Sequence, residues 1–260
     1  QYLDNTINML ILSDLRIVES RDALKNIPAG KVLINTINAH SFNTAQGDEV
    51  FAESLAHGGY LIPDGASIVK ACKFLKAKSR PKERIAGWDL FAFEMQRMAS
   101  LPEGEGATKR KVMFMGSSEK VLGLIRERAA VDYPNLEVVT YSPPYKAEFS
   151  AEDNADIVRA INEAKPDLLW IGMTAPKQEK WTYEHWAELD IDCHVGTIGA
   201  VFDFYAGTAV RAPRWWQEHG LEWLYRLLKE PRRMWRRYVV GNPLFLWNVL
   251  KERLICVNLP

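Results

Sequence analysis

The first 200 residues alternate between short apolar runs and longer segments with helical periodicity. The apolar runs predict β-strands at residues 31–37, 59–65, 84–91, 111–118, 136–142, 167–174 and 193–204. Most of the intervening segments predict helices, at residues 44–58, 66–78, 92–101, 119–133, 153–165 and 177–190. Because the strands are apolar almost throughout and alternate with helices, the pattern predicts an α/β fold, with a Rossmann-like parallel sheet covered by helices on both faces.

The pattern changes after Gly207. Residues 211–230 and 231–254 have helical periodicity, and Pro231 is suited to the first position of a helix. No further strand is predicted. We therefore expect two domains, a Rossmann-like α/β domain at 1–207 and a C-terminal helical appendage at 208–260.

Charge is distributed unevenly between these parts. From Arg211 onward the chain holds eight Arg and two Lys against four Glu, a net charge of +6, so the first 210 residues carry −6. Arg232 and Arg236 are spaced i, i+4, as are Arg233 and Arg237, and like charges at this spacing repel. The cluster favours an anionic partner, with a solvated basic face as the alternative.

The bulk composition is that of a soluble globular protein. The chain is 47% hydrophobic and 25% charged, with three widely spaced cysteines that form no disulfide framework and no metal-ligand pattern. No run of about 18 apolar residues is present, and no signal peptide is visible. Five of the nine Trp fall in the last fifty residues, where they suit either a membrane interface or a helix-packing core.

Several polar residues follow predicted strands, where open α/β sheets bind ligands. Asp64, in "LIPDG", is placed to accept a proton from a substrate hydroxyl, although Asp-Gly is also an ordinary turn signal. Thr36 and Asn38 are candidates for hydrogen bonds to a sugar or nucleotide, with helix capping as the alternative.

Two further candidates have equally simple alternatives. "ERIAGWDLF" carries Arg84 and Asp89, and a surface ion pair is the simple alternative to a binding role for Arg84. Gln178 in "MTAPKQEKW" opens a helix after a strand, where it could read a base or ribose, or belong to a solvated first turn.

The absence of some motifs from the sequence argues against several classes of protein. There is no Asp-x-Asp between apolar strands to hold a divalent cation beside a nucleotide diphosphate, so chemistry on phosphates is expected to use arginine rather than metal. An NAD-dependent oxidoreductase predicts Gly-x-Gly-x-x-Gly after an early strand, and the sequence has none. A nucleic-acid-binding protein would use the basic tail, but the acidic remainder of the chain argues against it.

Six blocks of the sequence, taken in order, match the pattern of a known protein family. In order they are "NTIN", "IPDGASIV", "RIAGWDLF", "APKQEKW", "GAVFDFYAGTAVRAPRW" and "GLEWLYRLLKEPRRMWRRY". From about Ile17 to Arg237, the sequence resembles glycosyltransferase family 26. This family includes N-acetylmannosaminyltransferases of teichoic-acid and enterobacterial-common-antigen synthesis, and glucosyltransferases of xanthan-type exopolysaccharide pathways.

The resemblance implies an inverting, metal-independent enzyme without a cofactor. Such an enzyme moves a hexose from a UDP-sugar to a sugar on undecaprenyl diphosphate, at the cytoplasmic face of an anionic membrane. The appendage would close the active site, the protein could form a homo-oligomer, and nucleic acid is not expected as a partner. Asp64 matches the proposed general base. The matching substrate-binding positions are Thr36, Asn38, Arg84, Gln178, Arg211, Arg226, Arg233 and Arg236.

The sequence departs from the family pattern around the donor pocket. The first block reads Thr36-Ile37-Asn38 where relatives more often have Thr-Pro-Asn or Thr-Leu-Asn. Ser67 stands where many relatives have Gly, and Met173-Thr174 replaces Leu-Gly. These departures leave the donor open between a ManNAc-type sugar and glucose.

Overall fold

The computed structural model describes residues 10–102 and 108–258. Its six strands form one sheet with the order β2-β1-β6-β5-β3-β4. The strands are β1 (Val32–Ile37), β2 (Tyr60–Pro63), β3 (Arg110–Gly116), β4 (Leu136–Tyr141), β5 (Leu168–Gly172) and β6 (His194–Thr197). The pairings β1–β6, β6–β5, β5–β3 and β3–β4 are all parallel, and the predicted α/β fold is confirmed.

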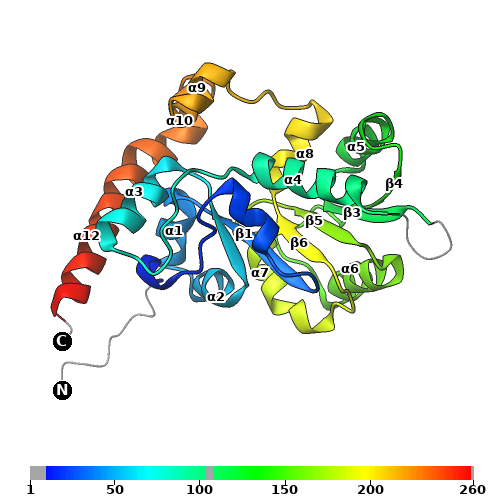
Figure 1. Ribbon diagram of the computed structural model, residues 1–260, viewed down its shortest axis with the longest axis horizontal. Coiled ribbons are helices and arrows are strands. Elements are labelled where there is room, and N and C mark those ends of the chain that lie inside the picture. Colours follow the sequence, from blue (N-terminus) through cyan, green and yellow to red (C-terminus); the bar gives the residue numbers. More distant parts are fainter. Residues whose placement is uncertain (1–9, 103–107, 259–260) are drawn as a thin grey trace. The chain divides into compact units, whose positions relative to one another are not determined.

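Helices connect these strands and make up the C-terminal region (Figure 1). The α-helices are α1 (Ala39–Ala45), α2 (Glu49–His57), α3 (Ala66–Leu75), α4 (Gly87–Ser100), α5 (Glu119–Asp132), α6 (Ala151–Ala164), α7 (Lys177–Glu184), α8 (Gly199–Ala206), α9 (Arg214–Glu218), α10 (Glu222–Lys229), α11 (Pro231–Trp235) and α12 (Gly241–Asn258). Short helical turns are η1 (Leu12–Asp14), η2 (Arg21–Asn26), η3 (Trp186–Glu188) and the π-helical η4 (Arg236–Val240).

Two of the predicted strands need correction. The strand predicted at 84–91 is wrong, because α4 begins at Gly87 and continues to Ser100. Its buried residues include Leu90, Phe91, Met95 and Met98, which recur at helical rather than alternating spacing. The run at 193–204 contains a strand only over β6, and its remainder forms α8, whose apolar residues extend the apolar run beyond the strand.

The chain divides into two compact units, which are described separately. The first comprises Gln1–Ala23, Thr36–Ala86 and Arg211–Pro260, and the second comprises Leu24–Asn35 and Gly87–Val210. The two domains expected from the sequence, at 1–207 and 208–260, stay a prediction. By its packing, however, Arg211–Pro260 belongs to the same unit as the two earlier segments.

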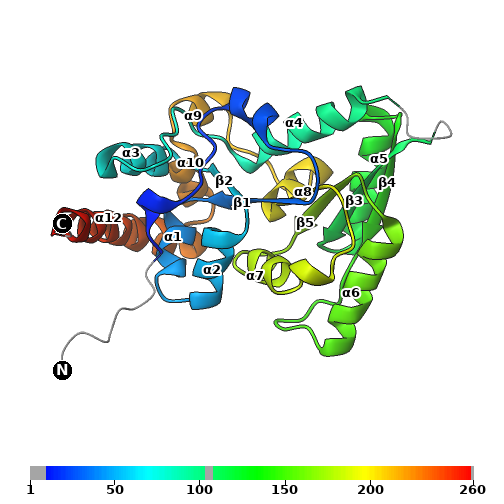
Figure 2. The ribbon, with the colours of Figure 1, turned by 60° about the horizontal axis from the view of Figure 1, so that its bottom comes forward.

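In the first unit, α12 packs against α1 and α3, and it runs alongside α1 in both ribbon views (Figures 1 and 2). The rings of Phe42 and Phe245 meet edge to face, with their centroids 5.6 Å apart. The buried Glu252 carboxylate accepts hydrogen bonds from the backbone N–H groups of Leu12 (2.9 Å) and Ser13 (2.8 Å). Apolar packing and a buried carboxylate therefore both hold the C-terminal helix within this unit.

In the second unit, β3 alternates between two cores. Met113 and Met115 pack in a cluster with residues of α6 and α7, including Ile157 and Trp181. Between them, the ring of Phe114 faces Phe202 of α8, 5.4 Å away between centroids. Figure 2 shows α6 and α7 on one side of these strands, with α4, α5 and α8 on the other. This alternation explains why the strand is apolar on both faces.

Candidate active site

Asp64 lies directly after β2, in the first unit. Its backbone N–H donates a hydrogen bond to the carbonyl oxygen of Ile37, the last residue of β1, over 2.8 Å. Gly65 has φ +150°, a conformation that favours glycine, and α3 begins at the next residue. The Asp-Gly pair thus makes a sharp strand-to-helix turn that presents the carboxylate at the carboxyl end of two neighbouring strands.

The backbone also brings Arg84 to this place. The N–H of Ile85 donates to the carbonyl oxygen of Pro63 over 3.0 Å, next to Asp64. The Arg84 Nε then lies 3.5 Å from Asp64 Oδ1. The two side chains are partly enclosed, with 34% of the Asp64 side chain and 23% of the Arg84 side chain exposed. Arg84 thus forms an ion pair with the candidate base Asp64.

Glu222, the first residue of α10, binds both Arg84 and Arg226. Its Oε2 lies 2.6 Å from Arg84 Nη2, and its Oε1 lies 3.0 Å from Arg226 Nη2, one helical turn further along. Glu222 is buried, being 8% exposed. Each carboxylate oxygen thus binds one arginine, which is the pairing that makes a buried charge tolerable.

The charges shift the pKa values of both acids. Burial raises the pKa of Asp64, Arg84 lowers it, Glu222 raises it, and Arg226 and Arg237 lower it, with a net shift above its ordinary value. Burial also raises the pKa of Glu222, but the charges of Arg84, Arg226 and Arg211 outweigh burial and bring it below the ordinary value. Glu222 is therefore ionised at neutral pH, and Asp64 is a stronger base than a free carboxylate.

Arg237 belongs to the positively charged C-terminal segment that begins at Arg211, and its charge acts on Asp64. The half-buried Arg237 lowers the pKa of Asp64, and it lowers that of His40 in addition to the larger effect of burial. Arg237 Nε is buried and has no hydrogen-bond partner among the described residues. Arg236 is exposed, and the side chain of Arg233 lies outside the described residues.

Thr36 and Asn38 flank Ile37, the partner of the Asp64 backbone. Thr36 is half-buried near the end of β1. Asn38 is the N-cap of α1, and its Oδ1 accepts hydrogen bonds from the backbone N–H groups of His40 and Ser41, both over 3.0 Å. The capping alternative therefore holds for this oxygen of Asn38.

Gln178 lies in the second unit, in the first turn of α7. Its Oε1 accepts hydrogen bonds from the backbone N–H groups of Met173 and Gly199, both over 3.1 Å. These residues follow β5 and β6, so one buried amide connects the loops at the carboxyl ends of two neighbouring strands. A Cβ added to Gly199 would lie 2.1 Å from the Met173 carbonyl oxygen, which explains why a glycine is needed there.

Glu179 stands beside this amide. Gln178 Nε2 donates to Glu179 Oε1 over 2.8 Å, whereas Glu179 Oε2 has no hydrogen-bond partner among the described residues. Glu179 is 2% exposed. Burial raises its pKa to about 7, although the hydrogen bond from Gln178 opposes the shift. Near neutral pH this buried carboxyl therefore changes its protonation state.

The comparison with protein families decides the class. Residues 9–257 match the model described as "Glycosyl transferase WecG/TagA/CpsF family". This chain belongs to that family. The match covers nearly the whole sequence, so the predicted resemblance to glycosyltransferase family 26 is confirmed, and the protein is a hexosyltransferase.

Individual relatives of this glycosyltransferase share one name, N-acetylglucosaminyldiphosphoundecaprenol N-acetyl-beta-D-mannosaminyltransferase. The protein from Bacillus subtilis (strain 168) is 28% identical over 220 residues, which cover 85% of this chain and 79% of the relative. That from Bacillus spizizenii is 31% identical over 76% of this chain and 70% of the relative. That from Staphylococcus aureus (strain MW2) is 25% identical over 96% of this chain and 90% of the relative.

Within this glycosyltransferase, the structure brings together Asp64, Arg84 and Arg226, and it adds two residues that the sequence interpretation did not assign to the site. Glu222 could have been found from its i, i+4 spacing to Arg226. Arg237 was named in the arginine cluster, but its action on Asp64 depends on a tertiary arrangement that the spacing of the arginines does not give.

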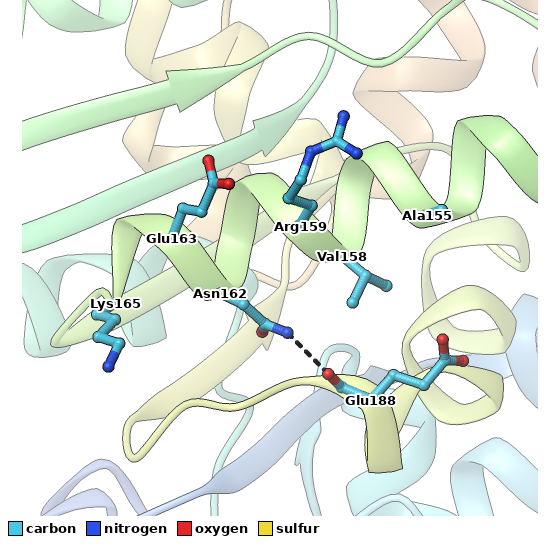
Figure 3. A pocket seen from close by; sticks show the side chains of 7 residues that line it. All are labelled: Ala155, Val158, Arg159, Asn162, Glu163, Lys165 and Glu188. Atoms are coloured by element: carbon cyan, nitrogen blue, oxygen red, sulfur yellow. Dashed lines mark hydrogen bonds between the residues drawn. The ribbon is translucent and has the colours of Figure 1, made fainter.

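Other features of the glycosyltransferase fall outside this cluster. A shallow pocket beside α6 and η3 is lined by residues that include Arg159, Asn162 and Glu188, and Asn162 Nδ2 donates to the Glu188 carbonyl oxygen over 2.9 Å (Figure 3). None of the predicted site residues lines it.

Among the described residues, no group of three His, Cys, Asp or Glu side chains could hold a metal ion, and no helix is long and apolar enough to cross a membrane.

Proposed function

We propose that this glycosyltransferase moves a hexose from a UDP-sugar to a sugar carried on undecaprenyl diphosphate, in the synthesis of a bacterial cell-surface polysaccharide. The observation that carries the proposal is the Asp64 carboxylate, which has a raised pKa and lies beside arginines at the carboxyl ends of β1 and β2. Family membership supports a glycosyl transfer. The names of the relatives support a lipid-diphosphate acceptor.

The proposed reaction is one in-line displacement, which inverts the anomeric carbon. The acceptor hydroxyl oxygen forms the new bond to this carbon while Asp64 takes the hydroxyl proton, and the bond to UDP breaks with its electron pair leaving on the diphosphate. A positioned base contributes about 10²–10⁴-fold to such a step. We propose that Arg84, Arg211 and Arg226 stabilise the charge that develops on the diphosphate, a role that needs no metal ion.

Thr36, Asn38 and Gln178, together with Arg233 and Arg236, stay proposed substrate-binding residues. The donor is proposed to be a ManNAc-type sugar, as in the names of the relatives. UDP-glucose is the second candidate, because Ile37, Ser67 and Met173-Thr174 depart from the common family pattern.

A panel of UDP-sugars tests this proposal. UDP-ManNAc, UDP-GlcNAc and UDP-glucose would each be offered with a short-chain lipid diphosphate carrying GlcNAc or glucose, with and without EDTA. We expect one donor and acceptor pair to give a product of inverted anomeric configuration at the same rate in EDTA. Retained configuration, or no transfer with any pair under conditions where a characterised relative is active, would contradict the proposal.

We also propose that the protein binds peripherally to the anionic cytoplasmic face of the membrane. Trp223, Trp235 and Trp247 are exposed along the C-terminal helices, and Arg232 and Arg236 are exposed near them in sequence. Indole rings favour the headgroup level, and each basic residue near an anionic surface contributes about 1 kcal/mol.

A further inference from the structure

Through Arg84, the buried Glu222 carboxylate connects the candidate base to the C-terminal helices. It belongs to α10, whereas Arg84 precedes α4 and Asp64 follows β2. All three residues lie in the first compact unit. No role is assigned to Glu222 by the family resemblance or by the names of the relatives, so its place in the cluster calls for its own explanation.

The contacts of Arg84 are unequal. Its Nη2 lies 2.6 Å from Glu222 Oε2, within the range of a charge-assisted hydrogen bond. Its Nε lies 3.5 Å from Asp64 Oδ1, which is an ion pair but longer than a normal hydrogen bond. Of these two contacts, the one to Glu222 is the closer, and the one to the candidate base is the looser.

This inequality matters for proton transfer. A carboxylate in a close, bidentate pair with arginine is stabilised as the anion, which makes it a weaker proton acceptor. A carboxylate that keeps only a long contact to arginine retains more of its basicity. Glu222 also binds Arg226, whose Nη2 lies 3.0 Å from Glu222 Oε1, and the charges of the arginines hold the pKa of Glu222 below its ordinary value.

We propose that Glu222 is a positioning residue for Asp64: by binding Arg84 and Arg226, it prevents either guanidinium from forming a close ion pair with the candidate base. The effect of this positioning on the transfer rate rests on the proposed function, whereas its effect on the Asp64 pKa does not. The arrangement of charges can be tested without any transfer reaction.

Four charged groups act on Asp64 from the surrounding elements, namely Arg84, Glu222, Arg226 and Arg237, and His40 lies within the influence of Arg237. Glu222 raises the pKa of Asp64, and the three arginines lower it. Replacing Glu222 by Gln removes the opposing negative charge and releases Arg84 toward Asp64. Both changes act in the same direction, so Asp64 should titrate at a lower pH.

The decisive measurement is the titration of the Asp64 carboxyl carbon by NMR, in the wild-type chain and in Glu222→Gln. We expect its pKa to fall by about one unit in Glu222→Gln. Glu222→Asp, which keeps the charge but has a shorter reach, should give a smaller fall and remains informative if Glu222→Gln does not fold. Glu230→Gln removes one charge from an exposed position after the same helix, and it should leave the titration unchanged.

Transfer rates against pH provide the second readout. If the proposed function is correct, the acidic limb of the kcat profile should move to lower pH in Glu222→Gln by the same amount as the NMR titration. A Glu222 that merely anchors α10 would reduce the rate at every pH without moving the limb. An Asp64 titration that is identical in the folded variants and the wild type would overturn the positioning role, whereas an enzyme that transfers no sugar would leave the NMR result intact and count against the proposed function alone.

Discussion

The backbone N–H of Asp64 donates a hydrogen bond to the carbonyl oxygen of Ile37 over 2.8 Å. This bond joins the residue after β2 to the last residue of β1, and it does not involve the Asp64 side chain. The ends of two neighbouring strands and the Gly65 turn therefore position the Asp64 backbone through contacts that do not use its side chain. Substitutions of the side chain should consequently leave the local backbone in place.

Gly199→Ala should destabilise the second unit. The added Cβ would lie 2.1 Å from the Met173 carbonyl oxygen and 2.9 Å from Gln178 Oε1, so the loop after β5 must shift and the buried amide must lose a hydrogen bond. We expect the free energy of unfolding in urea to fall by about 3 kcal/mol.

Gly123→Ala is the matched control. Gly123 lies inside α5, and a Cβ there would have only an ordinary contact, 3.8 Å from an Arg126 nitrogen. Because alanine favours a helix over glycine, this variant should be more stable by up to about 0.8 kcal/mol. Equal unfolding free energies for the two variants would show that the loops after β5 and β6 are not packed as described.

Glu179 should make the stability depend on pH. Burial raises its folded-state pKa to about 7 from an ordinary value of 4.5, so between these values the folded chain holds a proton that the unfolded chain has released. Stability contributed by this group is therefore complete at low pH, declines as the pH rises toward 7, and stays low above it. The total change is roughly 3 kcal/mol.

Glu179→Gln tests this sign, because an amide cannot ionise. We expect the variant to gain stability relative to the wild type as the pH is raised from about 5 to about 8, measured by urea unfolding at each pH. A difference between the two proteins that is the same at both pH values would show that Glu179 titrates normally.

The exposed arginines of the C-terminal helices should bind anionic vesicles. Replacing Arg232 and Arg236 together by Gln removes about 2 kcal/mol of attraction, which corresponds to a fall of about 30-fold in partitioning at low salt. Lys120→Gln with Lys165→Gln removes the same charge from exposed positions in the second unit. Co-sedimentation with vesicles rich in phosphatidylglycerol should separate the two double variants, and equal binding by both would argue against the basic tail as the membrane-binding surface.

The sequence predicted most of the architecture because strands buried on both faces leave a clear apolar signature. It misassigned residues 84–91, where a short apolar run containing Leu90 and Phe91 fits a strand or a buried helix equally well. The neighbouring residues Met95 and Met98 continue the same buried face at helical spacing, and only a longer window reveals it.

The site was predictable where it depends on local chemistry, and less so where it depends on tertiary contacts. Asp64 stands in a recognisable strand-to-helix turn, and Arg84 is the first residue of the block "RIAGWDLF". Glu222 acquires its importance only when α10 packs beside Arg84, a contact between residues 138 positions apart in the sequence. Gln178 was expected near a nucleotide, yet its Oε1 is used within the protein, because two backbone N–H groups from distant loops converge on it.

The measurement that tests the central claim most directly is sugar transfer by Asp64→Asn, compared with the wild type on the same lipid-linked acceptor. The variant should fold, because Arg84 keeps its contact with Glu222 and the backbone bond to Ile37 is retained. We predict that kcat falls by about 10²–10⁴-fold while the affinity for the UDP-sugar, measured by calorimetry, changes little. A folded Asp64→Asn protein that transfers sugar at close to the wild-type rate would contradict the assignment of Asp64 as the general base.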